Sequence, residues 1–379
     1  MTAAARSPKS EAAWRTARIR KAIGSAGFDA LIAFAPAWRR ENVRYVTDAA
    51  LDSSAALAYV PLSGAVSAFA CSPLDAQAMR QTGFVDDVQE VVFPDVSGLA
   101  DRVREDFARG RVGIAGAEFV PVTVWRQLQS LLPQIEFATA TDLMDGIRLV
   151  KSEFELARLR RAGEICDLSW KAFQAACRPG VREFEIVADV EARLRAEGAE
   201  DNFMLIASGG DEVRGMTPPS DRRLERGDLV RTELTPQFKG YWTQICRTAV
   251  VGPSTDRHRE SFALFEEAVV AGLEAIKPGV TAHEVAKAEN DVFRRHGYGE
   301  YCTSDYTRVR GHCMGLYLDE VHIIEGVHTV LEENAVLVVH PNTFTPLAGY
   351  FVLGDTVIVT PKGPEPLLST PRELNAVLE

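Results

Sequence analysis

Two stretches in the second half of the chain share one pattern, CRPGVREFEIVADVEARLRAEG (177–198) and IKPGVTAHEVAKAENDVFRRHG (276–297). In each, Pro-Gly-Val is followed by a glutamate at a constant offset, Glu185 or Glu284, and a glycine ends the stretch. Each copy therefore predicts a turn, a capped helix and a terminating glycine. Thr281 and Glu284 form a capping box at the start of the second helix. The repeat predicts a duplicated structural unit.

Similar segments flank both copies. A long amphipathic helix precedes each one, at 153–176 and at 257–275, and strand-like segments follow each one. The segments after the first copy are FMLIAS (203–208), DLVRTEL (228–234) and 241–251, and those after the second are 301–311, AVLVVH (335–340) and DTVIVT (355–360). A helix-helix-strand-strand unit, repeated about a pseudo-two-fold axis, is the economical interpretation. Its halves would meet at a central cleft, where ligands usually bind.

The first part of the chain has a different pattern. A helical stretch ends at Gly27, and buried strands are expected at 29–34, 55–60 and 111–116. Such alternation favours an α/β domain. Ser152 and Glu155 then form a capping box that opens the long helix. We expect two domains, 1–147 and 148–379.

Composition excludes several classes of protein. The chain of 379 residues carries 42 basic and 53 acidic side chains, a net charge of −11, which argues against binding a nucleic-acid backbone. No apolar run approaches the roughly 20 residues that span a bilayer, and the N-terminus lacks the apolar core of a secretory signal. The six cysteines include no CxxC pair. We expect a cytoplasmic protein that acts on a small molecule.

The arrangement resembles the pita-bread fold of methionine aminopeptidase, aminopeptidase P, prolidase and creatinase. The matching stretches are NVRYVTD (42–48), GDLVRTELTPQFKGYWTQICRTAVVG (227–252) and GHCMGL (311–316). The resemblance implies an α+β pita-bread C-terminal domain with a pseudo-two-fold repeat. A smaller α/β domain, ribonuclease H-like and of the creatinase N-terminal type, would precede it. The resemblance also implies a homodimer, in which Arg39 on the N-terminal domain could receive a substrate carboxylate in the partner's cleft.

The resemblance also assigns metal positions. Peptidases of this fold bind two metal ions through Asp, Asp, His, Glu and Glu side chains. The corresponding positions here are Glu233, Gln244, His312, His340 and Gly354. Two divalent cations close together require several anionic, bridging oxygens. The two positions that supply bridging carboxylates in those peptidases are Gln244 and Gly354 here, so both of these carboxylates are missing. The resemblance therefore implies a member of the family that lacks most metal ligands and uses no cofactor.

The expected function is metal-independent, creatinase-like hydrolysis of a C–N bond, of amide, amidine or urea type, in a small non-peptide metabolite. Glu233 and His312 would be the acid–base pair, and His340 a second proton-transfer group. Cys246 lies two residues after Gln244, on the same strand face, and would be a nucleophile, a substrate contact or a packing residue. The expected substrate contacts are Gln244, Trp242, Thr217, Asp319 and Arg39.

Two alternatives remain open. Glu233, His312 and His340 could hold a single iron or zinc ion, because two histidines and one carboxylate suit these metals; hydrolase or lyase chemistry would follow. The chain could instead be a non-catalytic pseudo-peptidase that binds a partner. The cleft has exchanged carboxylates for reactive residues such as Cys246, His340 and Gln244 rather than for Ala, Leu or Ser, which favours an enzyme.

Overall fold

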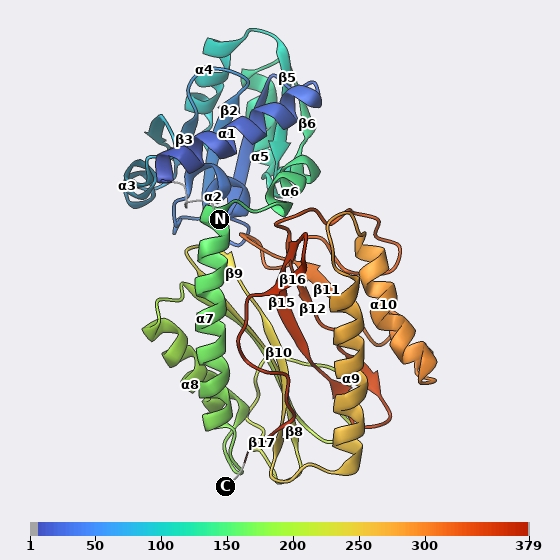
Figure 1. Ribbon diagram of the computed structural model, residues 1–379. Coiled ribbons are helices and arrows are strands. Elements are labelled where there is room, and N and C mark those ends of the chain that lie inside the picture. Colours follow the sequence, from blue (N-terminus) through green and yellow to red (C-terminus); the bar gives the residue numbers. More distant parts are fainter. Residues whose placement is uncertain (1–6, 378–379) are drawn as a thin grey trace. The chain divides into compact units, whose positions relative to one another are not determined.

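The structure is a computed structural model that describes residues 7–377. The chain divides into two compact units, Met1–Arg148 and Leu149–Glu379, and Figure 1 shows the helices and strands of each unit.

The first unit is built on a six-stranded mixed sheet in the order β4-β3-β2-β1-β5-β6. The helices and strands of this unit are α1 (Pro8–Ser25), β1 (Ala30–Pro36), α2 (Glu41–Thr47), β2 (Ala55–Pro61), β3 (Ser67–Ala70), α3 (Pro73–Thr82), β4 (Asp87–Glu90), α4 (Ser97–Asp106), β5 (Gly110–Ala115), η1 (Ala117–Phe119), α5 (Val122–Leu131), β6 (Ile135–Thr139) and α6 (Thr141–Leu149). The expected strands are β1, β2 and β5. Every residue of β1 and β2 is buried, which explains their almost uniformly apolar sequence.

The second unit is built on a nine-stranded sheet, whose main path runs β11-β12-β15-β10-β8-β7. Its helices and strands are α7 (Glu153–Ala176), α8 (Glu183–Ala196), β7 (Asp201–Gly209), β8 (Leu229–Phe238), β9 (Tyr241–Trp242), β10 (Ile245–Val251), α9 (Asp256–Ala275), α10 (Ala282–Arg295), η2 (Gly299–Cys302), β11 (Gly311–Cys313), β12 (Val336–Val339), β13 (Thr343–Thr345), β14 (Gly349–Phe351), β15 (Gly354–Thr360), β16 (Gly363–Pro366) and β17 (Asn375–Val377). Strands β13 and β14 form a separate hairpin.

The sheet path has the symmetry that the repeat predicts. Strands β7, β8 and β10 come from the first half of the unit, and β11, β12 and β15 occupy the equivalent places in the second half. The halves join where β10 pairs antiparallel with β15, with Ile245 opposite Asp355 and Cys246 opposite Gly354. Figure 1 shows α7 and α9, the two long helices, running alongside each other over the sheet.

Local sequence signals set the helix starts. The Ser152–Glu155 box opens α7 and the Thr281–Glu284 box opens α10, as the sequence predicts. In each box the side chain of the first residue accepts from the backbone N–H three residues later. These bonds satisfy donors that a helix start leaves open.

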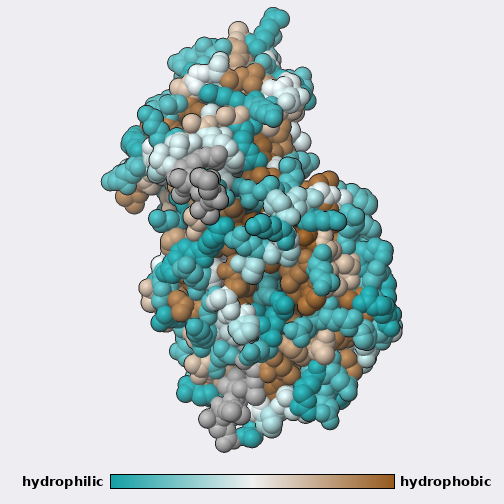
Figure 2. All heavy atoms as spheres, in the orientation of Figure 1, coloured by the Kyte–Doolittle hydropathy of each residue, from teal (hydrophilic) through white to brown (hydrophobic). Residues whose placement is uncertain are grey.

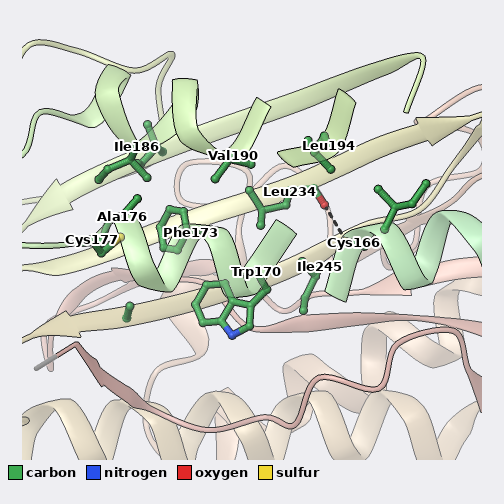
Figure 3. Close-up of a cluster of buried hydrophobic side chains, with 14 of the residues drawn as sticks. Cys166, Trp170, Phe173, Ala176, Cys177, Ile186, Val190, Leu194, Leu234 and Ile245 are labelled. Carbon is green, nitrogen blue, oxygen red and sulfur yellow. Dashed lines mark hydrogen bonds between the residues drawn. The ribbon is translucent and has the colours of Figure 1, made fainter. Parts of the chain in front are cut away.

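Each half packs its helices on its own strands. Figure 3 shows side chains of α7 and α8 filling the space beside β8 and β10. Trp170 and Phe173 stack there with ring centroids 5.2 Å apart. The second half mirrors this core with apolar side chains of α10, β12 and β15. Helices thus pack on the strands on both sides of the β10–β15 junction.

One expected strand is wrong. Residues 301–311 contain the end of the short helix η2, then turns, and enter β11 only at Gly311. The segment Thr303-Ser304-Asp305 is polar and exposed, so it has no apolar face to bury in a sheet. This loop instead forms part of a cavity wall.

Polar residues cover most of the visible surface of the second unit, and apolar residues show in smaller groups between them (Figure 2). Across residues 7–377, the helices are too short or too polar to cross a bilayer.

Candidate functional site

A cavity of about 390 Å³ opens in the second unit, and both halves of the repeat line it. The first half contributes from β7, β8 and the residues just before β10. The second half contributes from the 303–310 loop, β11, the segments after β11 and β12, and β14. The lining residues are Phe203, Leu205, Met216, Glu233, Gln244, Thr307, Arg308, Val309, His312, Leu318, Asp319, His340, Asn342 and Tyr350.

Glu233 projects from β8 into this cavity. Its Oε1 accepts a hydrogen bond of 2.8 Å from the Asn342 side-chain amide, and Cys246 is its cross-strand neighbour on β10. Burial raises the pKa of Glu233 to about 7, although the Asn342 bond opposes the rise. Near neutral pH the carboxyl group therefore exchanges readily between its acid and carboxylate forms, which suits proton transfer.

His312 on β11 and His340 after β12 place their rings together, with centroids 5.3 Å apart and an interplanar angle of 69°. Burial lowers the pKa of His312 to about 4 and lowers that of His340 as well. Nδ1 of His340 is buried without a hydrogen-bond partner in residues 7–377. Both rings are thus neutral at physiological pH and can accept a proton or a hydrogen bond from a ligand.

Cys246 is fully buried and does not line the cavity. Its Sγ accepts from the Gln244 side-chain amide at 3.2 Å. Burial and the neighbouring Glu233 raise the pKa of the thiol well above its ordinary value. Since the thiolate is the nucleophilic form, this environment opposes the nucleophile role and fits the packing role.

Arg308 and Asp319 face each other on the cavity wall. Nη1 of Arg308 donates to Asp319 Oδ2 at 2.9 Å, and Nη2 donates to Oδ1 at 3.3 Å. Burial opposes ionisation of Asp319, but hydrogen bonds from His322 and Arg308 hold its pKa well below the ordinary value. Asp319 is therefore a carboxylate, and its negative charge is already paired with Arg308.

The structure brings together five of the residues expected at the site: Glu233, Gln244, His312, Asp319 and His340. Thr217 and Trp242 are outside the lining. Thr217 pairs its backbone with Ile206, and Trp242 is nearly buried on β9, where it pairs with Gln237 of β8.

Arg39 lies in the first unit. Its Nε donates to Glu41 at 2.7 Å, and its guanidinium covers the ring of Phe119 at 4.9 Å. Its role at a partner's cleft, and the homodimer on which that role depends, stay predictions.

Sequence reasoning missed Arg308, Asn342, Tyr350 and the apolar wall of Phe203, Leu205 and Met216. A signal existed for Asn342, which follows His340 in the motif HPN (340–342). Arg308 was not expected at the cavity because residues 301–311 were expected to form a strand rather than a loop.

Comparisons with known proteins identify the family to which this architecture belongs. The family model described as "Metallopeptidase family M24" matches residues 157–361. The model described as "Creatinase/Prolidase N-terminal domain" matches residues 15–150. The chain belongs to metallopeptidase family M24. The expected fold, a creatinase-type N-terminal domain before a pita-bread domain, is confirmed.

Several of the similar proteins are named Xaa-Pro dipeptidase or prolidase. An Xaa-Pro dipeptidase of Pyrococcus furiosus is 34% identical over 242 residues, which cover 63% of this chain and 68% of that protein. The structure of a prolidase from Pyrococcus horikoshii OT3 matches with a TM-score of 0.82 and 26% identity, over 95% of this chain and 99% of that one. An Xaa-Pro dipeptidase from Bacillus anthracis matches with a TM-score of 0.84 and 25% identity, over 96% and 99%.

These relatives correct the expected function. Creatinase-like cleavage of a non-peptide C–N bond is wrong, since relatives matching by sequence and by structure carry the names of peptidases. The expectation that no cofactor is involved is contradicted too, because the family is one of metallopeptidases. The resemblance to creatinase reflected the shared fold, and a shared fold does not specify the reaction.

The residues at the family's metal positions do not fit a dinuclear centre. Gln244 supplies no charge, and Gly354 supplies no side chain. A Cβ on Gly354 would lie 2.4 Å from the Val339 carbonyl oxygen and 2.6 Å from Cβ of His340. The backbone of the neighbouring strand thus fills the space that a ligand side chain there would need.

The alternative of one metal ion on Glu233, His312 and His340 is likewise a poor fit. Within residues 7–377, no three His, Cys, Asp or Glu side chains come together in a group that could hold a metal ion. The two histidines meet each other, whereas Glu233 is held by Asn342.

Proposed function

We propose that this chain is a prolidase-like hydrolase that binds a dipeptide of the Xaa-Pro type in the cavity and cleaves its peptide bond. The observation that carries the proposal is the cavity itself. It lies in the unit that matches the M24 family, it has the volume of a small-ligand site, and both halves of the repeat supply its walls. The names of the relatives support a peptide substrate.

The two walls suit the two parts of such a peptide. Phe203, Leu205 and Met216 form an apolar surface on one side, where a proline ring or an aliphatic side chain would lose contact with water. Next to this surface, where Leu205 of β7 pairs with Glu233 of β8, Glu233, His312 and His340 offer a proton donor and two neutral acceptors. The carbonyl oxygen of an Xaa-Pro amide needs a hydrogen-bond donor, which protonated Glu233 can supply. The proline nitrogen carries no hydrogen, so the two histidines are left to accept from other groups of the ligand or from water.

We also propose that this member of the family has lost most of its metal ligands. The replacement of both bridging carboxylates, by Gln244 and Gly354, and the filled space beside Gly354 support this proposal. Proton transfer by Glu233 and His312 would then contribute more of the reaction than in relatives with the full ligand set.

The test is hydrolysis of Leu-Pro and Gly-Pro, with Leu-Gly as the non-proline control, by the full chain. Each reaction is run with chelator and with added Mn²⁺, Co²⁺ or Zn²⁺. We expect release of proline, and loss of at least about 100-fold in turnover for His312→Ala. The control variant is His296→Ala, a histidine exposed on the surface beside Glu267.

Release of proline from both Xaa-Pro peptides, with Leu-Gly left intact, supports the proposal. Absence of cleavage under every metal condition contradicts it. Peptide binding without cleavage also contradicts hydrolysis and would leave a peptide-binding protein. Strong activation by two bound equivalents of metal would contradict the loss of the ligand set.

A further inference from the structure

Two residues with a hydroxyl group line the cavity, Thr307 and Tyr350. The hydroxyl of Thr307 donates to the carbonyl oxygen of Val309 at 3.0 Å. The hydroxyl of Tyr350, on β14, makes no hydrogen bond to any of residues 7–377. A phenol can donate one hydrogen bond, so Tyr350 brings to the cavity a donor that the described part of the chain leaves unused.

The main chain of Tyr350 is held on both sides. Its N–H donates to the carbonyl oxygen of Val213 at 2.8 Å, and its carbonyl oxygen accepts from Nε of Arg231. Arg231 is fully buried, and it also donates to the carbonyl oxygens of Gly209 at 3.0 Å and Ala348 at 2.9 Å. One buried guanidinium therefore ties β14 to the end of β7 and fixes the backbone that carries the Tyr350 side chain.

The segment 210–214 supports the β13–β14 hairpin. A Cβ on Gly349 would lie 3.0 Å from Cα of Asp211, and the φ of this glycine is +74°, a conformation that suits glycine. The guanidinium of Arg214 lies 3.9 Å from the ring centroid of Phe344, the residue opposite Tyr350 in the hairpin. Tyr350 thus projects from packed backbone, and a donor held in this way needs little reorganisation during a reaction.

Tyr350 keeps its proton under physiological conditions. Burial raises the pKa of its phenol well above the ordinary value, and negative charge on Glu233 and Cys246 adds to the rise. Glu233, by contrast, has a pKa of about 7 and can release its proton. The cavity therefore contains one group that can give up a proton and another that can donate a hydrogen bond without giving up its proton.

Hydrolysis of a peptide bond uses both kinds of donor. When water attacks the carbonyl carbon, a C–O bond forms, His312 takes a proton from the water, and the π-electron pair moves onto the carbonyl oxygen. When the C–N bond then breaks, that pair forms the carbonyl again, and the electrons of the C–N bond go to the proline nitrogen, which takes the proton of Glu233. The proton on His312 afterwards replaces the one that Glu233 has lost. Between the two steps the oxygen is an anion, and fixed donors stabilise such an oxyanion strongly.

We propose that the hydroxyl of Tyr350 donates a hydrogen bond to this oxyanion and keeps its proton throughout the reaction. Tyr350 is thereby a further catalytic residue, which binds the transition state more strongly than it binds the planar peptide bond. This inference rests on the proposed function in taking an Xaa-Pro peptide bond as the reacting group.

The experiment compares the full chain with Tyr350→Phe, which removes only the hydroxyl group. The matched control is Tyr306→Phe, because Tyr306 stacks on Phe344 with ring centroids 6.1 Å apart but does not line the cavity. We measure kcat and KM for Leu-Pro under the metal condition of highest activity. Calorimetry measures binding of a phosphinic acid analogue of Leu-Pro, in which a tetrahedral phosphinate replaces the planar amide. Circular dichroism checks that both variants fold.

We expect Tyr350→Phe to lower kcat for Leu-Pro by about 100-fold. KM should change by less than about twofold, because the interaction is made in the transition state. The affinity for the phosphinic analogue should fall by about 10- to 100-fold, because its anionic oxygen takes the place of the oxyanion. Tyr306→Phe should leave all three quantities within about twofold of wild type.

A kcat for Tyr350→Phe within about threefold of wild type would overturn the proposal, and so would a rise in KM equal to the loss of affinity for the analogue. Failure of the proposed function has a different signature, because the wild-type chain then cleaves no peptide. Calorimetry with Leu-Pro and with the analogue still decides the role of Tyr350 in that case. Weakening of the analogue alone by Tyr350→Phe would support a contact with an anionic oxygen, whereas equal effects on both ligands, or no binding of the analogue, would contradict it.

Discussion

At the scale of single residues, burial decides the protonation chemistry of the cavity. Glu233 has a pKa near 7 because it is removed from water, and His312 has a pKa near 4 for the same reason. The carboxylate of Glu233 therefore takes up a proton at a higher pH than the ring of His312 does, which reverses the order of their pKa values in water. Near pH 6 the group able to donate a proton is Glu233, and the group able to accept one is His312.

This order predicts a pH profile. If the protonated carboxyl of Glu233 is the proton donor, turnover of Leu-Pro falls as pH rises through about 7. Glu233→Gln should lower turnover by about 100-fold or more and abolish that fall. The measurement is kcat from pH 5 to pH 9 for both proteins. An unchanged pH dependence in the variant would remove Glu233 from the reaction. The exposed Glu212 serves as a control, through Glu212→Gln.

At the scale of elements, helix α10 carries a buried carboxyl group, that of Glu289. Glu289 is fully buried, and neither of its oxygens has a hydrogen bond within residues 7–377. Gly272 of α9 leaves it room, since a Cβ there would lie 2.7 Å from Cγ of Glu289. Burial raises the pKa of Glu289 well above its ordinary value, and Arg310 offsets part of the rise.

The raised pKa of Glu289 determines how this residue makes the free energy of unfolding depend on pH. An acid whose pKa is higher in the folded state stabilises the fold fully below its unfolded pKa of about 4.3. That contribution is lost as pH rises toward the folded pKa. Glu289→Met should therefore raise the free energy of unfolding at pH 8 by about 1–3 kcal/mol, and by less at pH 5. Urea unfolding at both pH values checks this. Stabilisation equal at both pH values would mean that ionisation of Glu289 plays no part.

At the scale of the second unit, a buried ion pair joins the two halves of the repeat. Arg247 on β10 donates to Asp355 on β15 at 2.7 Å, with side chains 0% and 8% exposed. Arg372 donates to the other oxygen of Asp355 at 2.6 Å. The pair lies at the β10–β15 junction, one residue from Cys246 and Gly354, so the register of the halves and the depth of the cavity depend on the same contacts.

Removing one member leaves a buried charge without its partner. Asp355→Asn should lower the free energy of unfolding by about 3–5 kcal/mol. The comparison is Asp211→Asn, which removes an exposed pair with Arg257 and should change it by less than about 1 kcal/mol. Urea titration of the full chain gives both values. Equal effects of the two substitutions would show that the junction does not depend on the Arg247–Asp355 charge pair.

The sequence by itself determined the local and the repeated features of this protein. The capping boxes, the helices that follow them, and the order of the strands in each half depend on residues a few positions apart, and such patterns are visible in one sequence. The internal repeat then specified the pseudo-two-fold sheet. The resemblance to the pita-bread family, and not the repeat, implied that Glu233, His312 and His340 lie together in the cleft.

Only the tertiary structure decided what those residues can do. The polar run Thr303-Ser304-Asp305 argues against a strand over 301–311, but only the fold shows that this loop brings Arg308 to the cavity. The pairing of Asn342 with Glu233 joins residues 109 positions apart. The space beside Gly354 is filled by a neighbouring strand, and the protonation of Glu233 and His312 follows from their distance from water. These properties depend on packing across the sheet, where every contact combines distant segments and no local pattern records the result.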